Sequence, residues 1–458
     1  MTGLEKPARR ASLHTLGCRL NQSETRLLED QLRAAGYRIV PFGQPADLGV
    51  INTCTVPAQA DLKCRYEIRR FRRRNPQAFL AVIGCYAESG YRVLSAIDGI
   101  DLILGNRDKL NLLDYLGDGT RNPAPVLIRQ RLDRDDFTIP LAGDAPFPQR
   151  VNLKVQDGCD FVCGFCIIPR VRGPARSRDW QDLLVEARQL VRRGVRELVL
   201  TGVNIGTYSS HGYDIVALVD ALDALDGLWR IRISSIEPTT VPDALLDRMA
   251  AADHCLQPYL HLPLQAGCDR ILREMRRRYS LSEYEEFARQ AVARVPDLCL
   301  GTDILVGHPG ESDEDFAATC AFFLRLPFAY AHVFTYSERE RTLAARRTDS
   351  VPTVERQRRS ARLRSIATRQ RQLWNAQFIG CEMDVLIEDP QPDALCGYTA
   401  NYIRVATPLP PTPVNWRNRL ARVKLSRTVG EFVEADLLGL HESGAPVSTA
   451  GLLAGAAV

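Results

Sequence analysis

Long apolar segments are missing from this sequence. No stretch approaches the roughly 20 uninterrupted apolar residues that cross a bilayer, so we expect no membrane-spanning helix and no membrane partner. Residues 1–10 carry charge without an apolar core behind them, which predicts no secretory signal. The chain has 458 residues, 45% of them hydrophobic and 25% charged, enough for about two or three globular domains. We expect a soluble protein of the cytoplasm.

A large excess of charge of one sign is also missing. The formal net charge is only +4, so any affinity for nucleic acid must come from local patches. Two stretches are candidates: residues 63–74 carry seven basic residues against Glu67, and residues 341–371 carry ten arginines against Asp349 and Glu355. A solvated helix face would have the same pattern, so either interpretation stands for each patch alone.

Cysteine, in contrast, is plentiful. Thirteen cysteines without a secretory signal favour a reducing compartment, where thiols bind metal rather than pair as disulfides. Three of them follow the spacing Cys159-x-x-x-Cys163-x-x-Cys166, a loop that can hold three irons of a 4Fe–4S cluster and leave the fourth iron open. A structural zinc loop would need a fourth Cys or His nearby, and the next cysteine is Cys255. The spacing therefore favours a cluster whose open iron can bind a small molecule.

The first part of the chain alternates short apolar runs with helical patterns. An apolar stripe of Leu27, Leu28 and Leu32 within residues 22–35 predicts one of the helices. We expect a parallel α/β domain over residues 9–120. The strands predicted in it are 12–16, 48–52, 79–83 and 101–104.

Three further cysteines fall just past the ends of these predicted strands. They are Cys18, Cys54 and Cys85. Taken singly, each is explained more simply as a buried small hydrophobic residue. Ligands collect at the carboxyl ends of strands in open parallel sheets, and three equivalent positions therefore predict a second site with three thiols.

The middle of the chain predicts a second, larger α/β unit. Residues 119–149 are rich in proline and acidic residues and are expected to be a linker. Six strands with intervening helices follow, and a long helix over residues 352–374 is expected to close the unit. The predicted strands are 151–155, 197–201, 230–234, 259–264, 299–306 and 331–334. Six consecutive βα units predict a partial (β/α)6 barrel over residues 145–375, with its active site at the carboxyl ends of the strands.

The barrel rule makes polar residues near strand ends candidates for the active site. The cysteine loop follows the first predicted strand, as the rule requires. The polar residues at or near the ends of the other predicted strands are Asn204, Ser235, Glu237, Gln265, Asp303 and Tyr336. Any one of them could instead be only a cap or turn residue.

The end of the chain predicts a small antiparallel β domain over residues 378–441. Strand alternation appears at 383–387, 398–405 and 419–425, with prolines between. Residues 444–458 are rich in alanine and glycine and are expected to fray.

Taken together, these motifs resemble the methylthiotransferases of the radical S-adenosylmethionine (SAM) superfamily. The resemblance covers nearly the whole chain in three blocks, the last being a TRAM domain, an RNA-binding β module. The matching segments are 15–22, 52–56 and 84–86 in the first block, 159–178, 201–206, 262–265 and 307–311 in the second, and 397–402 in the third.

The resemblance implies two 4Fe–4S clusters, one on Cys159, Cys163 and Cys166 and the other on Cys18, Cys54 and Cys85. It also implies that the first cluster binds SAM and cleaves it to a 5′-deoxyadenosyl radical, while the second carries the sulfur to be inserted. Phe165 is expected to pack against the adenine of SAM. The other residues expected to bind SAM are Gly202, Val203, Asn204, Ser235, Glu237, Gln265 and Asp303.

Within the family, residues 19–25 and 201–208 look most like the branch that acts on N6-threonylcarbamoyladenosine (t6A) beside the anticodon of tRNA. That branch makes the 2-methylthio derivative and depends on an external electron donor and sulfur source. Alternative targets are isopentenyladenosine in tRNA and a ribosomal protein. A non-catalytic two-cluster electron carrier is the alternative from another class, but it would need neither a barrel mouth nor the 202–204 motif. The sequence leaves the oligomeric state open.

One segment departs from the family pattern. Where the family usually has Ser-x-Arg-x-Gly-Thr, this chain has Ser337-Glu338-Arg339-Glu340-Arg341-Thr342. The missing glycine and the extra charges are expected to alter the loop near the sulfur-bearing cluster.

Overall fold

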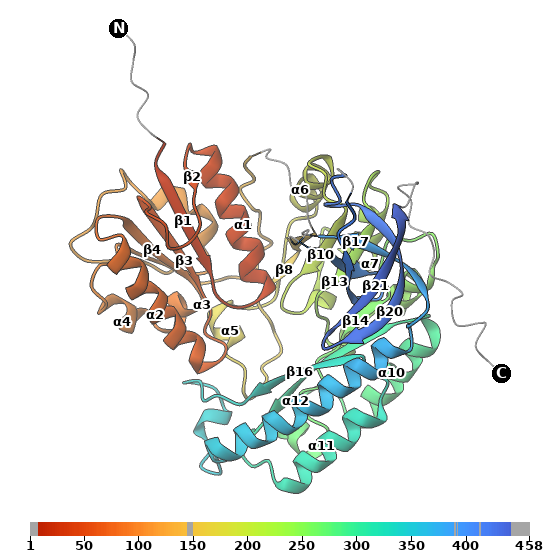
Figure 1. The fold of residues 1–458 in the computed structure, drawn as a ribbon. Coiled ribbons are helices and arrows are strands. Elements are labelled where there is room, and N and C mark those ends of the chain that lie inside the picture. Colours follow the sequence, from red (N-terminus) through yellow and green to blue (C-terminus); the bar gives the residue numbers. More distant parts are fainter. Residues whose placement is uncertain (1–7, 144–149, 389–390, 392, 412–413, 441–458) are drawn as a thin grey trace, which may run out of the picture.

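The computed structural model describes residues 8–143, 150–388, 391, 393–411 and 414–440. The expected frayed tail at 444–458 lies outside these residues. Figure 1 shows three bodies that follow one another along the chain: an N-terminal sheet with its helices, a central strand–helix unit and a C-terminal barrel. The predicted mixed α/β architecture is confirmed.

The N-terminal body is a six-stranded parallel sheet in the order β2-β1-β3-β4-β5-β6. Its strands are β1 (Arg10–Thr15), β2 (Arg38–Ile39), β3 (Leu48–Thr53), β4 (Phe79–Gly84), β5 (Leu102–Leu104) and β6 (Val126–Ile128). Its helices are α1 (Arg19–Ala34), α2 (Ala58–Arg74), α3 (Cys85–Ser89), α4 (Tyr91–Ser95) and the 3-10 helix η1 (Lys109–Tyr115). Strands β3 and β4 are buried along their whole length, as expected for a parallel sheet covered on both faces.

The edge strand β6 lies inside the segment that the sequence predicted to be a linker. Its residues pair with β5, Leu102 facing Val126 and Leu104 facing Ile128. Pro123 and Pro125, directly before it, concealed this three-residue strand, whose side chains are mostly exposed.

The central body contains the six predicted strands, all parallel, in two three-stranded sheets ordered β7-β10-β13 and β14-β15-β16. They are β7 (Val151–Lys154), β10 (Glu197–Thr201), β13 (Arg230–Ile233), β14 (Tyr259–His261), β15 (Cys299–Val306) and β16 (Tyr330–Thr335). Backbone hydrogen bonds from Ile231 N to Cys255 O and from Gln257 N to Ile231 O join the two sheets. The strand order follows the chain, as a partial barrel requires.

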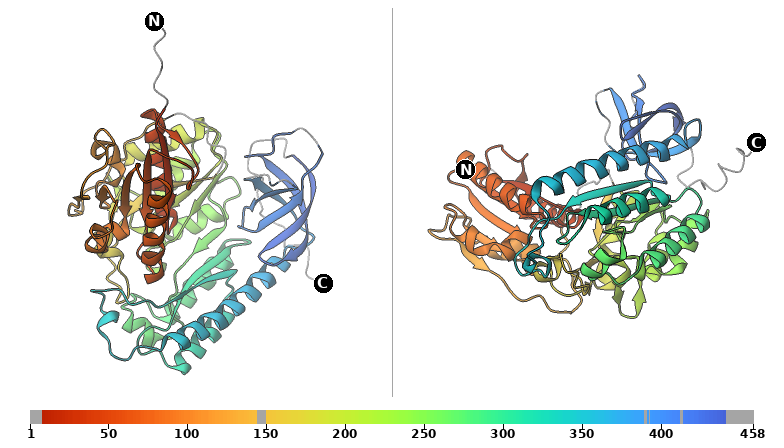
Figure 2. Two further views of the ribbon diagram at one scale, coloured as in Figure 1. Left: turned by 60° about the vertical axis from the view of Figure 1, so that its left-hand side comes forward. Right: turned by 90° about the horizontal axis from the view of Figure 1, so that it is seen from below.

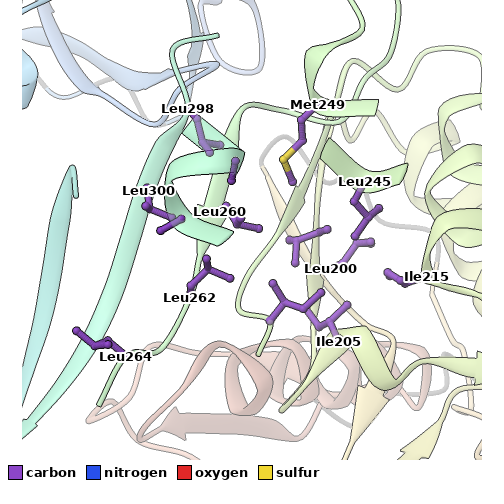
Figure 3. Packing of buried hydrophobic residues seen from close by; sticks show 14 of the residues in the cluster. Leu200, Ile205, Ile215, Leu245, Met249, Leu260, Leu262, Leu264, Leu298 and Leu300 are labelled. Atoms are coloured by element: carbon purple, nitrogen blue, oxygen red, sulfur yellow. The ribbon is translucent and has the colours of Figure 1, made fainter. Parts of the chain in front are cut away.

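Helices cover the outside of these strands. The longer ones are α6 (Trp180–Arg192), α7 (Ile215–Asp223), α8 (Asp243–Ala250), α10 (Leu281–Arg294) and α11 (Asp313–Arg325). Figure 3 shows how Leu200 of β10 and Leu260 of β14 meet Leu245 of α8 in a packed cluster. All three side chains are fully buried. This packing fills the space between the strands and the outer helices, and the carboxyl ends of the strands are left for ligands.

The C-terminal body is a closed five-stranded barrel in the order β17-β18-β19-β21-β20, antiparallel except for the parallel pair β19 and β21. Its strands are β17 (Glu382–Ile387), β18 (Ala394–Thr399), β19 (Arg404–Pro408), β20 (Leu420–Val429) and β21 (Phe432–Leu440). The single strand predicted at 398–405 is wrong. A tight turn divides it, because Tyr402 adopts a φ of 63° and its N–H bonds back to Thr399 O.

The long helix α12 (Thr353–Ala376) runs beneath the central body and leads into the C-terminal barrel (Figures 1 and 2). Pro352 is its N-cap residue rather than part of its first turn. Two of its arginines are buried in ion pairs, Arg356 with Glu338 and Arg359 with Glu311. This arginine-rich stretch is therefore partly structural. Over the residues that the structure describes, no helix is both long and apolar enough to cross a membrane.

Candidate active site between two cysteine loops

The loop of Cys159, Cys163 and Cys166 projects from a small antiparallel clamp. Strand β8 (Gln156–Asp157) pairs with β9 (Arg176–Ser177), and the N–H of Cys159 donates to Gly173 O at 3.1 Å. Gly158 has a φ of 71°, and a Cβ there would lie 1.9 Å from Pro174 O. Glycine is required at this position, because only it permits both the backbone conformation and the close approach.

Burial dominates the electrostatics of these three thiols. It raises the pKa of Cys159 to about 11 and that of Cys166 to about 12. Burial also raises the pKa of Cys163, although an Arg277 nitrogen 3.3 Å from its Sγ opposes the shift. All three are free cysteines. Buried thiols of this kind become thiolates when positive metal ions replace their protons, so this donor set fits an iron–sulfur cluster.

The second set of cysteines lies where three neighbouring strands of the N-terminal sheet end. Cys18 is the N-cap of α1 after β1, Cys54 follows β3, and Cys85 is the first residue of α3 after β4. Gly17 has a φ of 102°, and a Cβ on it would lie 2.8 Å from Cys54 Sγ. Burial, reinforced by Cys85 and Cys18, raises the pKa of Cys54 to about 12. Three free thiols therefore converge here, and their chemistry also fits a cluster.

A cavity of about 290 Å³ lies between the two cysteine loops. Val56 and Pro57, just after Cys54, form its N-terminal wall, and Cys166 contributes from the core loop. Six of the eight residues expected to bind SAM also line it: Phe165, Val203, Ser235, Glu237, Gln265 and Asp303. Tyr336, another strand-end candidate, lines it as well.

The remaining two, Gly202 and Asn204, are not among the lining residues. Gln156 Oε1 accepts the backbone N–H groups of Val203 at 2.8 Å and Asn204 at 3.0 Å. A Cβ on Gly202 would lie 2.8 Å from the same oxygen. The Asn204 side chain accepts from the N–H of Glu237 at 3.2 Å. Gly202 and Asn204 hold the strand-end loops together. Gln156 was missed, although it too follows a predicted strand.

Glu237 and Arg277 connect the cavity wall to the core cysteine loop. Burial raises the pKa of Glu237, and the ion pair with Arg277 opposes this. The Arg277 guanidinium also contacts Cys163 Sγ and the carbonyl of Pro263. The sequence had no signal for Arg277 beyond a run of three arginines at 276–278.

Asp303 belongs to a polar cluster whose two histidines were not predicted from the sequence. The nitrogen and oxygen donor atoms of His261, Asp303 and His332 lie within 4.8 Å of one another. His261 Nε2 is 3.0 Å from Asp303, and His261 Nδ1 is 2.9 Å from the Tyr330 hydroxyl. Burial alone would raise the pKa of Asp303, but His261 lowers it overall.

Positively charged side chains act on this cluster. Partial loss of solvent lowers the pKa of the His332 side chain, and His261, Arg19 and Arg371 add to the shift, opposed by Asp303. Arg277 acts on Asp303 in the same direction as His261.

The loop that departs from the family pattern docks the central body onto the N-terminal one. Ser337 Oγ accepts the N–H of Ala58 at 2.9 Å, and Arg339 pairs with Asp61 at 2.9 Å and also contacts Thr55. Arg341, at the place of the usual glycine, has a φ of 68°. The loop therefore keeps the backbone conformation that glycine favours while carrying a larger side chain.

Comparison with known families agrees with this architecture. Residues 153–323 match a domain described as the radical SAM superfamily, and residues 10–105 match one described as uncharacterized protein family UPF0004. The radical SAM methyltransferase TsrM from Kitasatospora setae, solved with cobalamin and a [4Fe-4S] cluster bound, has a TM-score of 0.52 at 14% identity. The alignment covers 74% of this chain and 77% of that one. This likeness shows the fold alone.

Sequence relatives define the family more closely. Threonylcarbamoyladenosine tRNA methylthiotransferase MtaB of Bacillus subtilis is 34% identical over 86% of this chain and 89% of its own length. The tRNA-2-methylthio-N(6)-dimethylallyladenosine synthase of Cereibacter sphaeroides is 34% identical over 83% of this chain and 88% of its own. The chain belongs to the radical SAM methylthiotransferase family, which confirms the expected use of SAM and two 4Fe–4S clusters. The assignment of individual residues to these cofactors stays a prediction.

Proposed function

We propose that this protein is a tRNA methylthiotransferase that converts t6A beside the anticodon into its 2-methylthio derivative. The observation that carries the proposal is the cavity between the two cysteine loops, whose walls come from both domains. A reaction that needs a radical from one site and sulfur from another requires both to reach one substrate atom. Relatives from Bacillus subtilis and Aquifex aeolicus that are named for the t6A reaction support this choice.

In this proposal, Cys159, Cys163 and Cys166 hold the cluster that binds SAM, and Cys18, Cys54 and Cys85 hold the second one. When bound, SAM and a reduced cluster supply a 5′-deoxyadenosyl radical, the difficult part of the chemistry. The protein supplies orientation and excludes water.

The cavity walls are suited to holding SAM. Phe165 offers an apolar face for the adenine. Ser235 and Gln265 offer hydrogen-bonding groups at the strand ends. Arg277 holds Glu237 in place through their ion pair, beside the Cys163 thiol.

Positive charge near the cavity favours t6A over isopentenyladenosine. The threonylcarbamoyl group ends in a carboxylate, whereas the isopentenyl group is apolar. His332 lies beside Asp303, and Arg19 and Arg371 are near enough to lower the pKa of His332. The two carboxylates on the cavity wall, Glu237 and Asp303, are already paired with Arg277 and His261. In this proposal an anionic substituent is attracted to Arg19 and Arg371, whereas an apolar one gains nothing from them.

A second, polar cavity of about 400 Å³ is the proposed contact for the tRNA backbone. It lies where α1, β7 and the C-terminal barrel meet, and its basic residues are Arg19, Arg150 and Arg404. The Arg150 guanidinium stacks 4.7 Å from the Tyr398 ring, while Glu388 pairs with it at 3.0 Å. Arginines grouped in this way position phosphates without reading bases.

The proposal includes partners that the chain itself does not supply. An external electron donor must reduce the clusters, and an external source must replace the transferred sulfur. A substrate in tRNA and clusters that need a reducing environment support a place in the cytoplasm.

The test is an anaerobic assay of the reconstituted protein with SAM, reductant and tRNA carrying either t6A or isopentenyladenosine, with nucleosides read by mass spectrometry. We expect the methylthio product on t6A, at least tenfold less on isopentenyladenosine, and none from Cys54→Ala. A product on isopentenyladenosine alone contradicts the substrate assignment. Absence of 5′-deoxyadenosine would instead favour a non-catalytic electron carrier.

A further inference from the structure

Arg172 of the central body is buried among charged groups at the junction with the N-terminal body. Its side chain is 1% exposed. Its guanidinium donates to Asp157 at 2.9 Å, to Asn21 at 2.6 Å and to Glu24 at 3.2 and 3.3 Å. Asp157 immediately precedes the core cysteine loop, whereas Asn21 and Glu24 lie on α1, which begins after Cys18. One side chain thus connects the bases of both loops.

The contacts of Asn21 bring Arg172 close to the N-terminal cysteines. The Asn21 amide donates to Leu16 O at 2.8 Å and to Thr53 O at 3.0 Å. These carbonyls belong to the residues directly before Gly17-Cys18 and before Cys54. Val171, the neighbour of Arg172, packs against Cys85. Arg172 is therefore held close to the loops that carry Cys18, Cys54 and Cys85.

Positive charge exceeds negative charge in this buried network. Glu24 pairs with Arg172, Lys109 and Lys154. Asp157 pairs with Arg172, Lys154 and Arg176, and Lys154 Nζ is 2.8 Å from each carboxylate. Arg172 carries a positive charge here, because a guanidinium stays protonated in proteins. Burial lowers the pKa of Lys109, and Arg172 and Lys154 add to the shift although Glu24 opposes it.

An uncompensated buried charge is costly unless an opposite charge lies beside it. The cationic core of a 4Fe–4S cluster offsets part of the charge of three thiolate ligands at Cys18, Cys54 and Cys85, so the whole group would be an anion beside this network. It would gain one more negative charge on reduction. The excess positive charge of the network can balance the negative charge of such a cluster.

We propose that Arg172, a residue of the radical SAM core, is the counter-charge of the cluster in the neighbouring domain and holds that cluster's reduction potential at a more positive value. Reduction adds negative charge, so a nearby fixed cation favours the reduced state. Arg172 is a positioning and tuning residue rather than a catalytic one. The inference rests on the proposed ligation by Cys18, Cys54 and Cys85.

The experiment uses the full chain with Cys159, Cys163 and Cys166 all changed to Ala, so that only the N-terminal cluster is reconstituted. The midpoint potential is followed by electron paramagnetic resonance during redox titration. Arg172→Gln should shift the one-electron equilibrium at least tenfold toward the oxidised form, or about 59 mV more negative. Arg172→Lys keeps the charge and should stay closer to the parent.

Glu24→Gln should shift the midpoint potential in the opposite direction from Arg172→Gln. Misfolding would not produce opposite shifts in the two variants. Glu24→Gln removes a negative charge from the same network without changing side-chain size, so the potential should become more positive. Arg178→Gln is the matched control, because Arg178 is also fully buried but pairs with Glu186 and Asp182 instead. It should leave the potential unchanged.

The inference is overturned if Arg172→Gln and Glu24→Gln shift the potential in the same direction or not at all. It is equally overturned if Arg178→Gln shifts it as much as Arg172→Gln. If the Arg172→Gln variant takes up no cluster, the Glu24→Gln variant decides: a more positive potential supports the inference, and a more negative or unchanged one overturns it. A parent protein that takes up no cluster overturns the ligation and this inference with it, whereas a loaded parent with unmoved potentials overturns the inference alone.

Discussion

Arg341 is held in a left-handed backbone conformation in the loop that joins the two domains. Its φ is 68°, and the turn is closed by a hydrogen bond from Thr342 N to Arg339 O. A residue with a Cβ in such a conformation carries strain that glycine avoids.

Arg341→Gly should raise the free energy of unfolding by about 1 kcal/mol, the relief of strain exceeding the greater entropy of glycine in the unfolded chain. Urea denaturation of the apo-protein measures the change. Arg341→Ala is the control, since it removes the exposed guanidinium but keeps the strain. A glycine variant no more stable than the alanine variant contradicts this explanation.

The pKa values of the buried thiols predict how the apo-protein reacts. Burial raises the pKa of Cys159 to about 11 and those of Cys166 and Cys54 to about 12. A raised thiol pKa keeps the proton bound at neutral pH, and only the thiolate is alkylated.

At pH 8 the alkylation of Cys54, Cys159 and Cys166 by iodoacetamide should be at least tenfold slower than that of free cysteine. The rates should still be rising above pH 9, because the thiolate fraction keeps growing up to the folded pKa. Peptide mass spectrometry after timed quenching gives the rate for each residue. A plateau near pH 8.5 would mean that these thiols are not buried as described.

At the scale of elements, the loop after β16 is a second connection between the two cysteine sites, besides Arg172. Arg339 and Asp61 are 10% and 18% exposed at their side chains and form an ion pair at 2.9 Å. Asp61 lies in the first turn of α2, shortly after Cys54. The pair therefore sets where Cys54 lies relative to the barrel mouth.

Arg339→Gln and Asp61→Asn should show a coupling energy of about 1 kcal/mol in a double-mutant cycle, because the pair is partly buried. Each should reduce methylthio product more than it reduces 5′-deoxyadenosine, since radical formation needs only the core loop. Arg248→Gln on α8, in an exposed pair with Asp220, is the control and should change neither product. Equal loss of both products would argue against a role in aligning the two sites.

At the scale of the whole molecule, the three bodies meet around a few arginines. Arg19 of α1 donates to the Tyr402 hydroxyl at 2.7 Å, and Arg232 of β13 donates to Thr399 O at 2.8 Å. These bonds join the C-terminal barrel to both other bodies, next to the basic cavity. Figure 2 shows the barrel beside the central body in two views.

Arg404→Gln should weaken tRNA binding several-fold and reduce the slope of log K against log salt by about one, the effect of losing one phosphate contact. Filter binding over a salt series measures both quantities. Arg289→Gln on α10, outside the lining of that cavity, should leave binding unchanged. If the affinity falls while the salt slope stays the same, Arg404 does not contact a phosphate.

Local patterns in the sequence predicted much of the fold. Strands such as β3, β4 and β15 have apolar runs that are visible without any partner, and the cysteine spacing indicated the core loop directly. The pattern failed in two short segments: the turn at Tyr402 divides a predicted strand, and β6 is short and directly follows Pro125.

The sequence by itself determined which chemistry the protein can perform, because thiols at fixed spacing and at strand ends define their ligand type before folding. Only the tertiary structure decided what surrounds them. Gln156 behind the 202–204 loop, Arg277 beside Cys163, and Arg172 between Glu24 and Asp157 are contacts across 47, 114 and 148 residues of chain. No local pattern encodes them, because a long polar side chain finds its partner only when packing brings distant segments to the same buried place.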